Sequence, residues 1–212
     1  MDGLEIFIYV VVLLFSVIIH ETAHAVTANF RGDDTAKRAG RITLNPLPHI
    51  DLFGSIILPA VLIIFQSPLL FGWAKPVPVN YANLKNPKFD SALVSAAGPL
   101  SNAFLAVAAG LLIRGIKAVP SFEQGVLGSL TMLLSLLVTV NVILLILNLI
   151  PVPPLDGSKI AAYFMPEALA FKYLNLHPAI YFVFLIIILS TDFLWKIIAP
   201  FMKFFIKTIV GG

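Results

Sequence analysis

The composition of this 212-residue chain is that of a membrane protein: 59% of the residues are hydrophobic and 12% are charged, with a net charge of +3 at pH 7. Soluble domains carry about 25% charged residues, so an ordinary soluble domain is excluded. Most Lys and Arg residues fall between apolar runs, which is typical of membrane topology and not of nucleic-acid binding. The chain has no cysteine, which excludes disulfides and thiolate metal sites.

The first apolar run, Leu4–Ile19, leads into the stretch HETAH at residues 20–24. In a helix His20 and His24 are i and i+4, so their imidazoles lie on one face, with Glu21 beside it. This is the H-E-x-x-H arrangement, in which two imidazoles bind Zn²⁺ and the glutamate acts as general base. The alternative is a helix end whose polar residues simply meet the membrane interface. We favour the zinc site, because ionisable residues at the edge of an apolar run are costly and usually functional. The run is expected to be a retained span and not a cleaved signal peptide.

The polar connection and the second apolar segment follow. Residues 38–44 alternate weakly and predict a short strand. The apolar segment 52–71 contains Pro59 and Pro68, which interrupt a helix. Residues 75–80, with two further prolines, predict an extended piece that could pair with 38–44 beside the site.

Three further apolar segments complete the chain, at about 87–113, 126–150 and 178–209, with an amphipathic stretch at 158–176 before the last. We therefore expect an all-α polytopic membrane protein with about five apolar segments. Asn102 and Asn141 lie within apolar segments, and we favour interhelical packing for both.

A third zinc ligand is expected near the end of the segment at 126–150. Asp156 follows a run of prolines that forces irregular backbone, and Gly157 behind it would permit unusual dihedral angles. A carboxylate there suits a catalytic zinc, which usually has three protein ligands. Without the two histidines, the favoured interpretation of Asp156 would be a residue of a surface turn at a helix terminus, with no role in metal binding.

The motifs together resemble the site-2 protease family of intramembrane zinc metalloproteases. The resemblance rests on HETAH and on NLIP followed by PLDG at 148–157, with support from GWAKPVPVN and AAGPLSN, and it covers roughly residues 15–160. It implies His20, His24 and Asp156 on zinc, Glu21 as the base that activates zinc-bound water, and Asn148 near the metal, holding substrate. Ser158 stands where the family commonly has a second glycine. No PDZ-like insertion is present, so the resemblance is to the short form of the family.

The function implied is cleavage of membrane-anchored proteins in or near their transmembrane segments, with one Zn²⁺ per chain. Residues 1–212 are expected to form a single membrane-embedded metalloprotease domain, with a catalytic core over about 4–160 and the amphipathic stretch and last span over 158–212. The alternatives are a catalytically silent zinc-binding membrane protein and a metal-ion transporter. An intact Glu21 argues against the first, and the absence of an inverted repeat argues against the second.

The depth of the ligands constrains the topology. If segments two, three and four each crossed the membrane once, Asp156 would leave on the opposite face from His24, about 30 Å away. We therefore expect segment 52–71 to be re-entrant. Nine of the 14 Lys and Arg residues then face the cytoplasm, which predicts a multi-pass protein of the cell membrane with its active site near the cytoplasmic side. For His49, polar packing is favoured over a contact with the site.

Overall fold

The computed structural model describes residues 3–65, 74–120, 125–177, 180, 183 and 193–211. Its described part is helical. The helices are α1 (Gly3–Phe30), α2 (Thr35–Arg38), η1 (Leu47–His49), η2 (Leu52–Ile57), α3 (Leu58–Ile64), η3 (Tyr81–Asn83), α4 (Pro87–Lys117), α5 (Gly125–Leu149), α6 (Asp156–Tyr163), α7 (Glu167–Leu174), α9 (Phe193–Phe205) and η4 (Ile206–Gly211).

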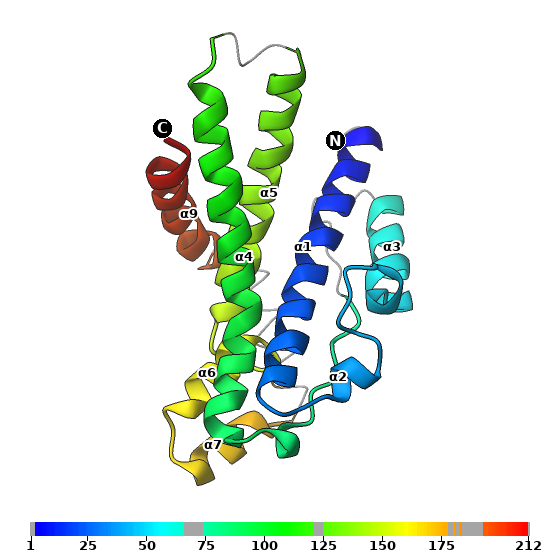
Figure 1. Cartoon of the computed structure of the whole chain (residues 1–212), viewed down its shortest axis with the longest axis vertical. Helices are drawn as coiled ribbons and strands as arrows, with labels where there is room; N and C mark the ends of the chain where they lie inside the picture. Colours follow the sequence, from blue (N-terminus) through cyan, green and yellow to red (C-terminus); the bar gives the residue numbers. More distant parts are fainter. Residues whose placement is uncertain are drawn as a thin grey trace.

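Three of the described helices, α1, α4 and α5, are long and apolar enough to cross a membrane. Figure 1 shows α4 running antiparallel to both α1 and α5, with α2, α6 and α7 gathered at one end. At that end α1 finishes, α4 begins and α5 finishes. The predicted segments 4–29, 87–113 and 126–150 therefore correspond closely to spans.

The core lies between α4 and α5. Ala106 and Ala109 on α4 are almost completely buried, and their small side chains allow α5 to approach closely. Val138 and Val142 of α5 fill the space opposite, and Val210 of η4 closes the same cluster from the C-terminal side. This packing fixes α4 as the central helix, and α4 therefore determines how α1 and α5 face each other.

The predicted strands at 38–44 and 75–80 are not confirmed, because both ranges are described and neither forms a β-strand. Pro76 and Pro78 have no N–H to donate to a ladder. The two stretches are nevertheless neighbours, joined through a side chain: Arg41 Nη2 donates to the carbonyl oxygens of Lys75 (2.5 Å) and Pro76 (3.3 Å).

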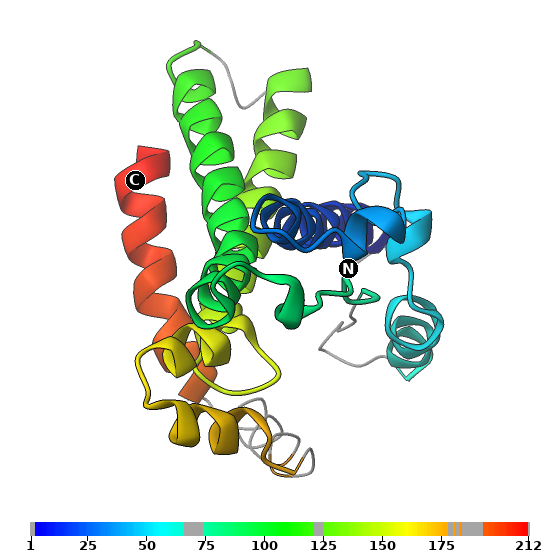
Figure 2. The ribbon, with the colours of Figure 1, turned by 60° about the horizontal axis from the view of Figure 1, so that its bottom comes forward.

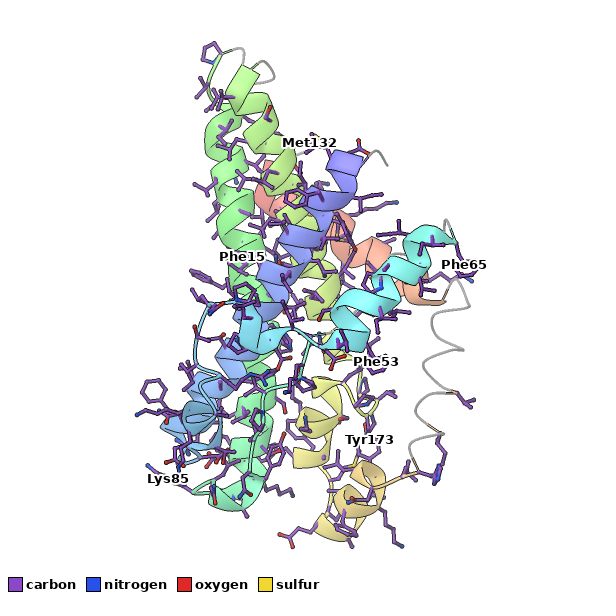
Figure 3. The ribbon with its side chains drawn as sticks, turned by 90° about the vertical axis from the view of Figure 1, so that its right-hand side faces the viewer. Phe15, Phe53, Phe65, Lys85, Met132 and Tyr173 are labelled. Atoms are coloured by element: carbon purple, nitrogen blue, oxygen red, sulfur yellow. The ribbon has the colours of Figure 1, made fainter. Side chains whose placement is uncertain are left out.

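The second apolar segment is seen as η2 and α3. Asp51 caps η2 by accepting from the N–H groups of Phe53 and Gly54. Together η2 and α3 span only 13 residues, fewer than a bilayer crossing needs. Figure 3 shows Phe53 and Phe65 near the two ends of this segment, both exposed. Re-entry of the whole segment stays a prediction, since residues 66–73 lie outside the described part.

The amphipathic stretch predicted at 158–176 consists of two short helices, α6 and α7. Figure 2 shows α6 beside the first turns of α4, with α7 next to α6. The last apolar run, predicted at 178–209, falls largely outside the described residues. Its final part forms α9 and η4, which pack against α5 and α4.

A buried carboxylate ties the connections at this end together. Asp33 accepts hydrogen bonds from Thr35 Oγ1, from Asn83 Nδ2 and from the N–H of Asn80. Burial opposes the ionisation of Asp33, but these hydrogen bonds outweigh it and hold the pKa of its carboxyl below its usual value. The ionised Asp33 thus fixes Asn80, the end of the irregular segment 74–80, against the end of α1.

Candidate active site

The two histidines of the HETAH stretch lie on one face of α1, as the helical spacing predicts. Their rings are arranged edge to face with centroids 4.6 Å apart, and the two Nε2 atoms are 3.0 Å from each other. Both side chains are buried. The face that carries His20 and His24 is turned toward α4 and away from the lipid-facing side of α1.

Asp156 reaches the same point from the other end of the chain. After α5 ends at Leu149, the proline-rich stretch 150–155 makes a tight turn, and Asp156 begins α6. Its Oδ2 atom lies 3.1 Å from His20 Nε2 and 3.2 Å from His24 Nε2. The structure therefore brings together the three residues that the sequence predicted as ligands.

Gly157 is needed here for a reason other than the one the sequence suggested. It is a helical residue, and among the described residues the glycines with positive φ are at positions 32, 40 and 125. A Cβ at position 157 would lie 2.3 Å from the Leu149 carbonyl oxygen and 2.5 Å from that of Ile150. Gly157 thus permits close approach of α6 to the end of α5, which sets the position of Asp156.

A second glycine makes room for the imidazoles. A Cβ at Gly98 of α4 would lie 2.5 Å from His20 Nε2 and 2.5 Å from His24 Nε2. Pro99 follows it within the same helix. The imidazoles therefore occupy the space that a side chain at position 98 would take, and any residue larger than glycine there would clash with them.

Gly98→Ala is expected to lower zinc affinity about 10–100-fold, the range seen when the groups that orient metal ligands are lost. The added methyl would push both rings aside, whereas the helix itself would tolerate alanine well. Zinc per purified chain, measured against a competing chelator, tests this. Gly115→Ala is the matched control, because nothing lies within 4 Å of a Cβ there. Equal zinc affinity in the two variants would contradict the argument.

The outer nitrogen of each imidazole is held by a protein oxygen. His24 Nδ1 donates to the Val94 carbonyl at 2.7 Å. His20 Nδ1 lies 2.6 Å from Asn102 Oδ1, and Asn102 Nδ2 donates to Asn141 Oδ1 at 2.8 Å, which leaves the Asn102 oxygen to accept. Both rings are therefore in the tautomer that directs an unprotonated Nε2 toward Asp156, as metal ligation requires.

Asn102 and Asn141 do join helices, as predicted, and the same contacts reach the site. Asn141 Nδ2 donates to Ser16 Oγ at 2.9 Å, so one buried network connects α1, α4 and α5 directly behind His20. Sequence reasoning missed the role of Asn102, because nothing local in the sequence indicates that it faces His20. The one feature of the sequence that pointed to a role for Asn102 was the presence of an amide side chain within an apolar segment.

Asn102→Leu, which removes the acceptor while keeping a side chain branched at the same atom, is expected to weaken zinc binding about 10–100-fold. His20 would lose the partner that fixes its tautomer and ring orientation. Chelator competition measures the affinity. Thr139→Val is the control, since the Thr139 hydroxyl bonds only within α5, to the Ser135 carbonyl. An unchanged affinity in Asn102→Leu would mean that the amide serves packing alone.

The orientation of the Glu21 side chain is set by the irregular segment 74–80. The N–H of Val77 donates to Glu21 Oε2 at 2.8 Å. A cavity of about 460 Å³ lies here, called the catalytic cavity below; its walls come from α1, α4, α5, the start of α6 and residues 74–81. His20, His24, Asp156 and Glu21 all line it. A carboxylate beside two imidazoles in a cavity can take a proton from water held there.

The donor set fits a zinc ion. Zn²⁺ binds imidazole nitrogen and carboxylate oxygen at about 2.0–2.2 Å, which places tetrahedral ligand atoms about 3.3 Å apart. The three atoms of His20, His24 and Asp156 are 3.0–3.2 Å apart. The space left by Gly98 and the fixed tautomers are further features that a metal site needs. A carboxylate oxygen of Glu21 and a ring nitrogen of each histidine all lie within 4.8 Å of one another, so Glu21 is also close to the proposed metal position.

Comparison with known proteins identifies the family. The profile described as Peptidase family M50 matches residues 113–191, which include Asp156. YwhC of Bacillus subtilis strain 168, which its name assigns to the zinc metalloproteases, is 37% identical over 186 residues, covering 85% of this chain and 80% of YwhC. The chain belongs to peptidase family M50. This is a family of zinc metalloproteases, in agreement with the donor set described above.

A second relative of this M50 chain is Rip2 of Mycolicibacterium smegmatis, also named as a zinc metalloprotease. It is 33% identical over 144 residues, covering 68% of the M50 chain and 52% of Rip2. No solved structure matches the chain significantly. Two relatives named for the same activity thus agree with the family profile.

The remaining candidates in the M50 chain lie as follows. Asn148 lines the catalytic cavity, with its Nδ2 donating to the Leu144 carbonyl within α5. His49 is buried away from the cavity, where its Nε2 is 3.0 Å from the Thr43 carbonyl and its own carbonyl accepts from the N–H of Lys75. The preference for polar packing of His49 agrees with this position.

Proposed function

We propose that this M50 peptidase is an intramembrane zinc endopeptidase that cleaves membrane-anchored proteins in or near their transmembrane segments. The observation that carries the proposal is that the walls of the catalytic cavity are formed by the long apolar helices. The HETAH stretch lies on α1, the opposing wall comes from α4, and Asp156 directly follows α5. All three helices are apolar and long enough to cross the bilayer. A site enclosed by them is therefore accessible to substrate segments that also lie in the membrane.

His20, His24 and Asp156 hold the metal in this proposal. Zinc, when bound, supplies Lewis acidity to the scissile carbonyl and lowers the pKa of water to about 7. Glu21 takes the proton of the attacking water and delivers it to the leaving amine. The hydrogen bond from Val77 keeps the Glu21 carboxylate pointing into the cavity throughout.

The substrate must be unwound before it can react, because a helix keeps its carbonyls in intrahelical hydrogen bonds. Residues 74–79 have no regular structure, and four of them line the catalytic cavity together with Asn148: Ala74, Pro76, Val77 and Val79. An extended piece of substrate lying between them would exchange its lost helical hydrogen bonds for contacts with this segment and with the Asn148 amide. Asn148 is therefore assigned to substrate holding.

The site is placed near the cytoplasmic side of the cell membrane. The end of α1, the start of α4 and the helices α6 and α7 lie at one end of the bundle (Figure 1). The cavity is lined there by Glu21 and His24 of α1, by residues of the segment 74–81 and by the start of α6. The connections after α1 and before α4, together with α6, α7 and the first turn of α4, carry nine of the 14 Lys and Arg residues, and positively charged loops remain preferentially in the cytoplasm.

The test uses the purified full chain, reconstituted with zinc and a single-span membrane protein as substrate. We expect cleavage within the span or close to its ends, located by mass spectrometry of the products. Chelation should stop cleavage, and added zinc should restore it. A catalytically silent zinc-binding protein would hold zinc without cleaving, and a transporter would move zinc into sealed vesicles. Either result, or cuts confined to distant soluble regions, would contradict the proposal.

A further inference from the structure

A second cavity adjoins the catalytic one. It has a volume of about 640 Å³ and lies between the start of α4, α6 and α7. Tyr81, Pro154 and Lys159 line both cavities, so the two share a wall. The second cavity is therefore adjacent to the one that holds His20, His24 and Asp156.

The second cavity presents two ammonium groups. Lys159 follows Asp156 by three positions on α6, is half-buried, and has its Nζ 5.8 Å from the centre of the Tyr81 ring. Lys88 Nζ lies 5.9 Å from the centre of the Tyr163 ring and donates to the Met165 carbonyl at 2.8 Å. Aromatic rings beside both lysines orient the ammonium groups without neutralising them.

Neither lysine forms an ion pair among the residues that the structure describes. The lining of the second cavity, as far as the structure describes it, includes no Asp or Glu. Among the described residues of the catalytic cavity, Lys159 is the one Lys or Arg, and it shares that cavity with the carboxylates of Glu21 and Asp156. An ammonium group keeps three donors, which a carboxylate satisfies with charge-assisted hydrogen bonds.

We propose that Lys159 and Lys88 form a subsite that binds an acidic side chain of the peptide being cleaved, near the scissile bond. This rests on the proposed function, because it assigns the occupant as part of the protein substrate. A peptide is favoured over a lipid headgroup because Lys159 lines both cavities and therefore lies beside the space that receives the scissile bond in the proposed function.

Binding without cleavage tests the subsite. Full-length Glu21→Gln protein, loaded with zinc in zwitterionic vesicles, would be titrated with single-span peptides that carry one Asp at successive positions flanking the span. At one or two positions Asp should bind about tenfold tighter than Asn, as expected for one hydrogen bond to a charged group. Adding Lys159→Gln should abolish that difference. Lys172→Gln is the control, because Lys172 is exposed on α7 and lines neither cavity.

Reversing the charge of residue 159 provides a second binding experiment. With Lys159→Glu, a Lys at the same peptide position should bind better than Asp, provided that the zinc content is unchanged. Equal binding of Asp and Asn peptides at every position would overturn the subsite. A lysine effect that occurs only with anionic lipid, whatever the peptide charge, would overturn it in favour of a headgroup site. Loss of the proposed function would be seen separately, as failure of the unmutated chain to cleave any peptide.

Discussion

Replacing Glu21 by glutamine is expected to lower the rate of peptide-bond cleavage about 10²–10⁴-fold, the range that general acid–base catalysis contributes. The amide keeps the shape of the side chain and can still accept the hydrogen bond from Val77, but it cannot take a proton from water. His20, His24 and Asp156 are untouched by this change, so zinc content should stay at one ion per chain. Single-turnover cleavage of a membrane-anchored substrate, together with zinc analysis of the same sample, measures both quantities.

The control for this variant is Glu167→Gln, a matched substitution of an exposed glutamate on α7. It should leave both cleavage and zinc unchanged. Cleavage by Glu21→Gln at the rate of the unmutated chain would show that another group acts as the base. Loss of zinc together with activity would instead place Glu21 among the groups that hold the ion.

Asp156→Ala is expected to have the largest effect on the metal itself. Asp156 supplies the one carboxylate oxygen within 3.2 Å of both His20 Nε2 and His24 Nε2 in the described chain. Losing a direct ligand should reduce zinc affinity more than the 10–100-fold typical of the groups that orient ligands. The purified variant should therefore lose zinc to a competing chelator at concentrations that leave the unmutated chain loaded, and it should be inactive.

Asp34→Ala is the control for the aspartate change. Asp34 is paired with Arg38 near the end of α1, and this exposed pair is expected to contribute little to stability. Zinc binding in that variant should match the unmutated chain. Unchanged zinc stoichiometry and affinity in Asp156→Ala would mean that the third ligand is a different residue.

The parts of the site that could be predicted from sequence are those encoded in local spacing. His20 and His24 are one helical turn apart, so the helix alone brings them together. Asp156 was found because prolines mark the end of α5 and because the motifs occur in a known order. The three long spans were evident from their apolar length.

The contacts behind His20 and His24 could not be predicted, since they depend on which face of α4 meets α1. Gly98 and Asn102 lie on that face, but the stretch AAGPLSN predicts only that some helix approaches closely. The hydrogen bond between His20 and Asn102 joins residues 82 positions apart. Local propensity carries no information about such a pair.

The expectation of paired strands was not confirmed for a related reason. Alternation at 38–44 is compatible with a strand, but its partner contains Pro76 and Pro78, which cannot complete a ladder. The side chain of Arg41 makes the connection instead. The proximity of the two stretches was thus anticipated, whereas the type of contact was not.

The contact between Gly157 and the last carbonyls of α5 links the position of the metal site to the bilayer. Because α6 begins directly against Leu149 and Ile150, Asp156 moves with the end of the span. If the protein cleaves within the membrane, as proposed, the depth of α5 in the hydrocarbon layer fixes the depth at which a substrate can be cut. Membranes of different thickness are then expected to bring different bonds of the same substrate to the site.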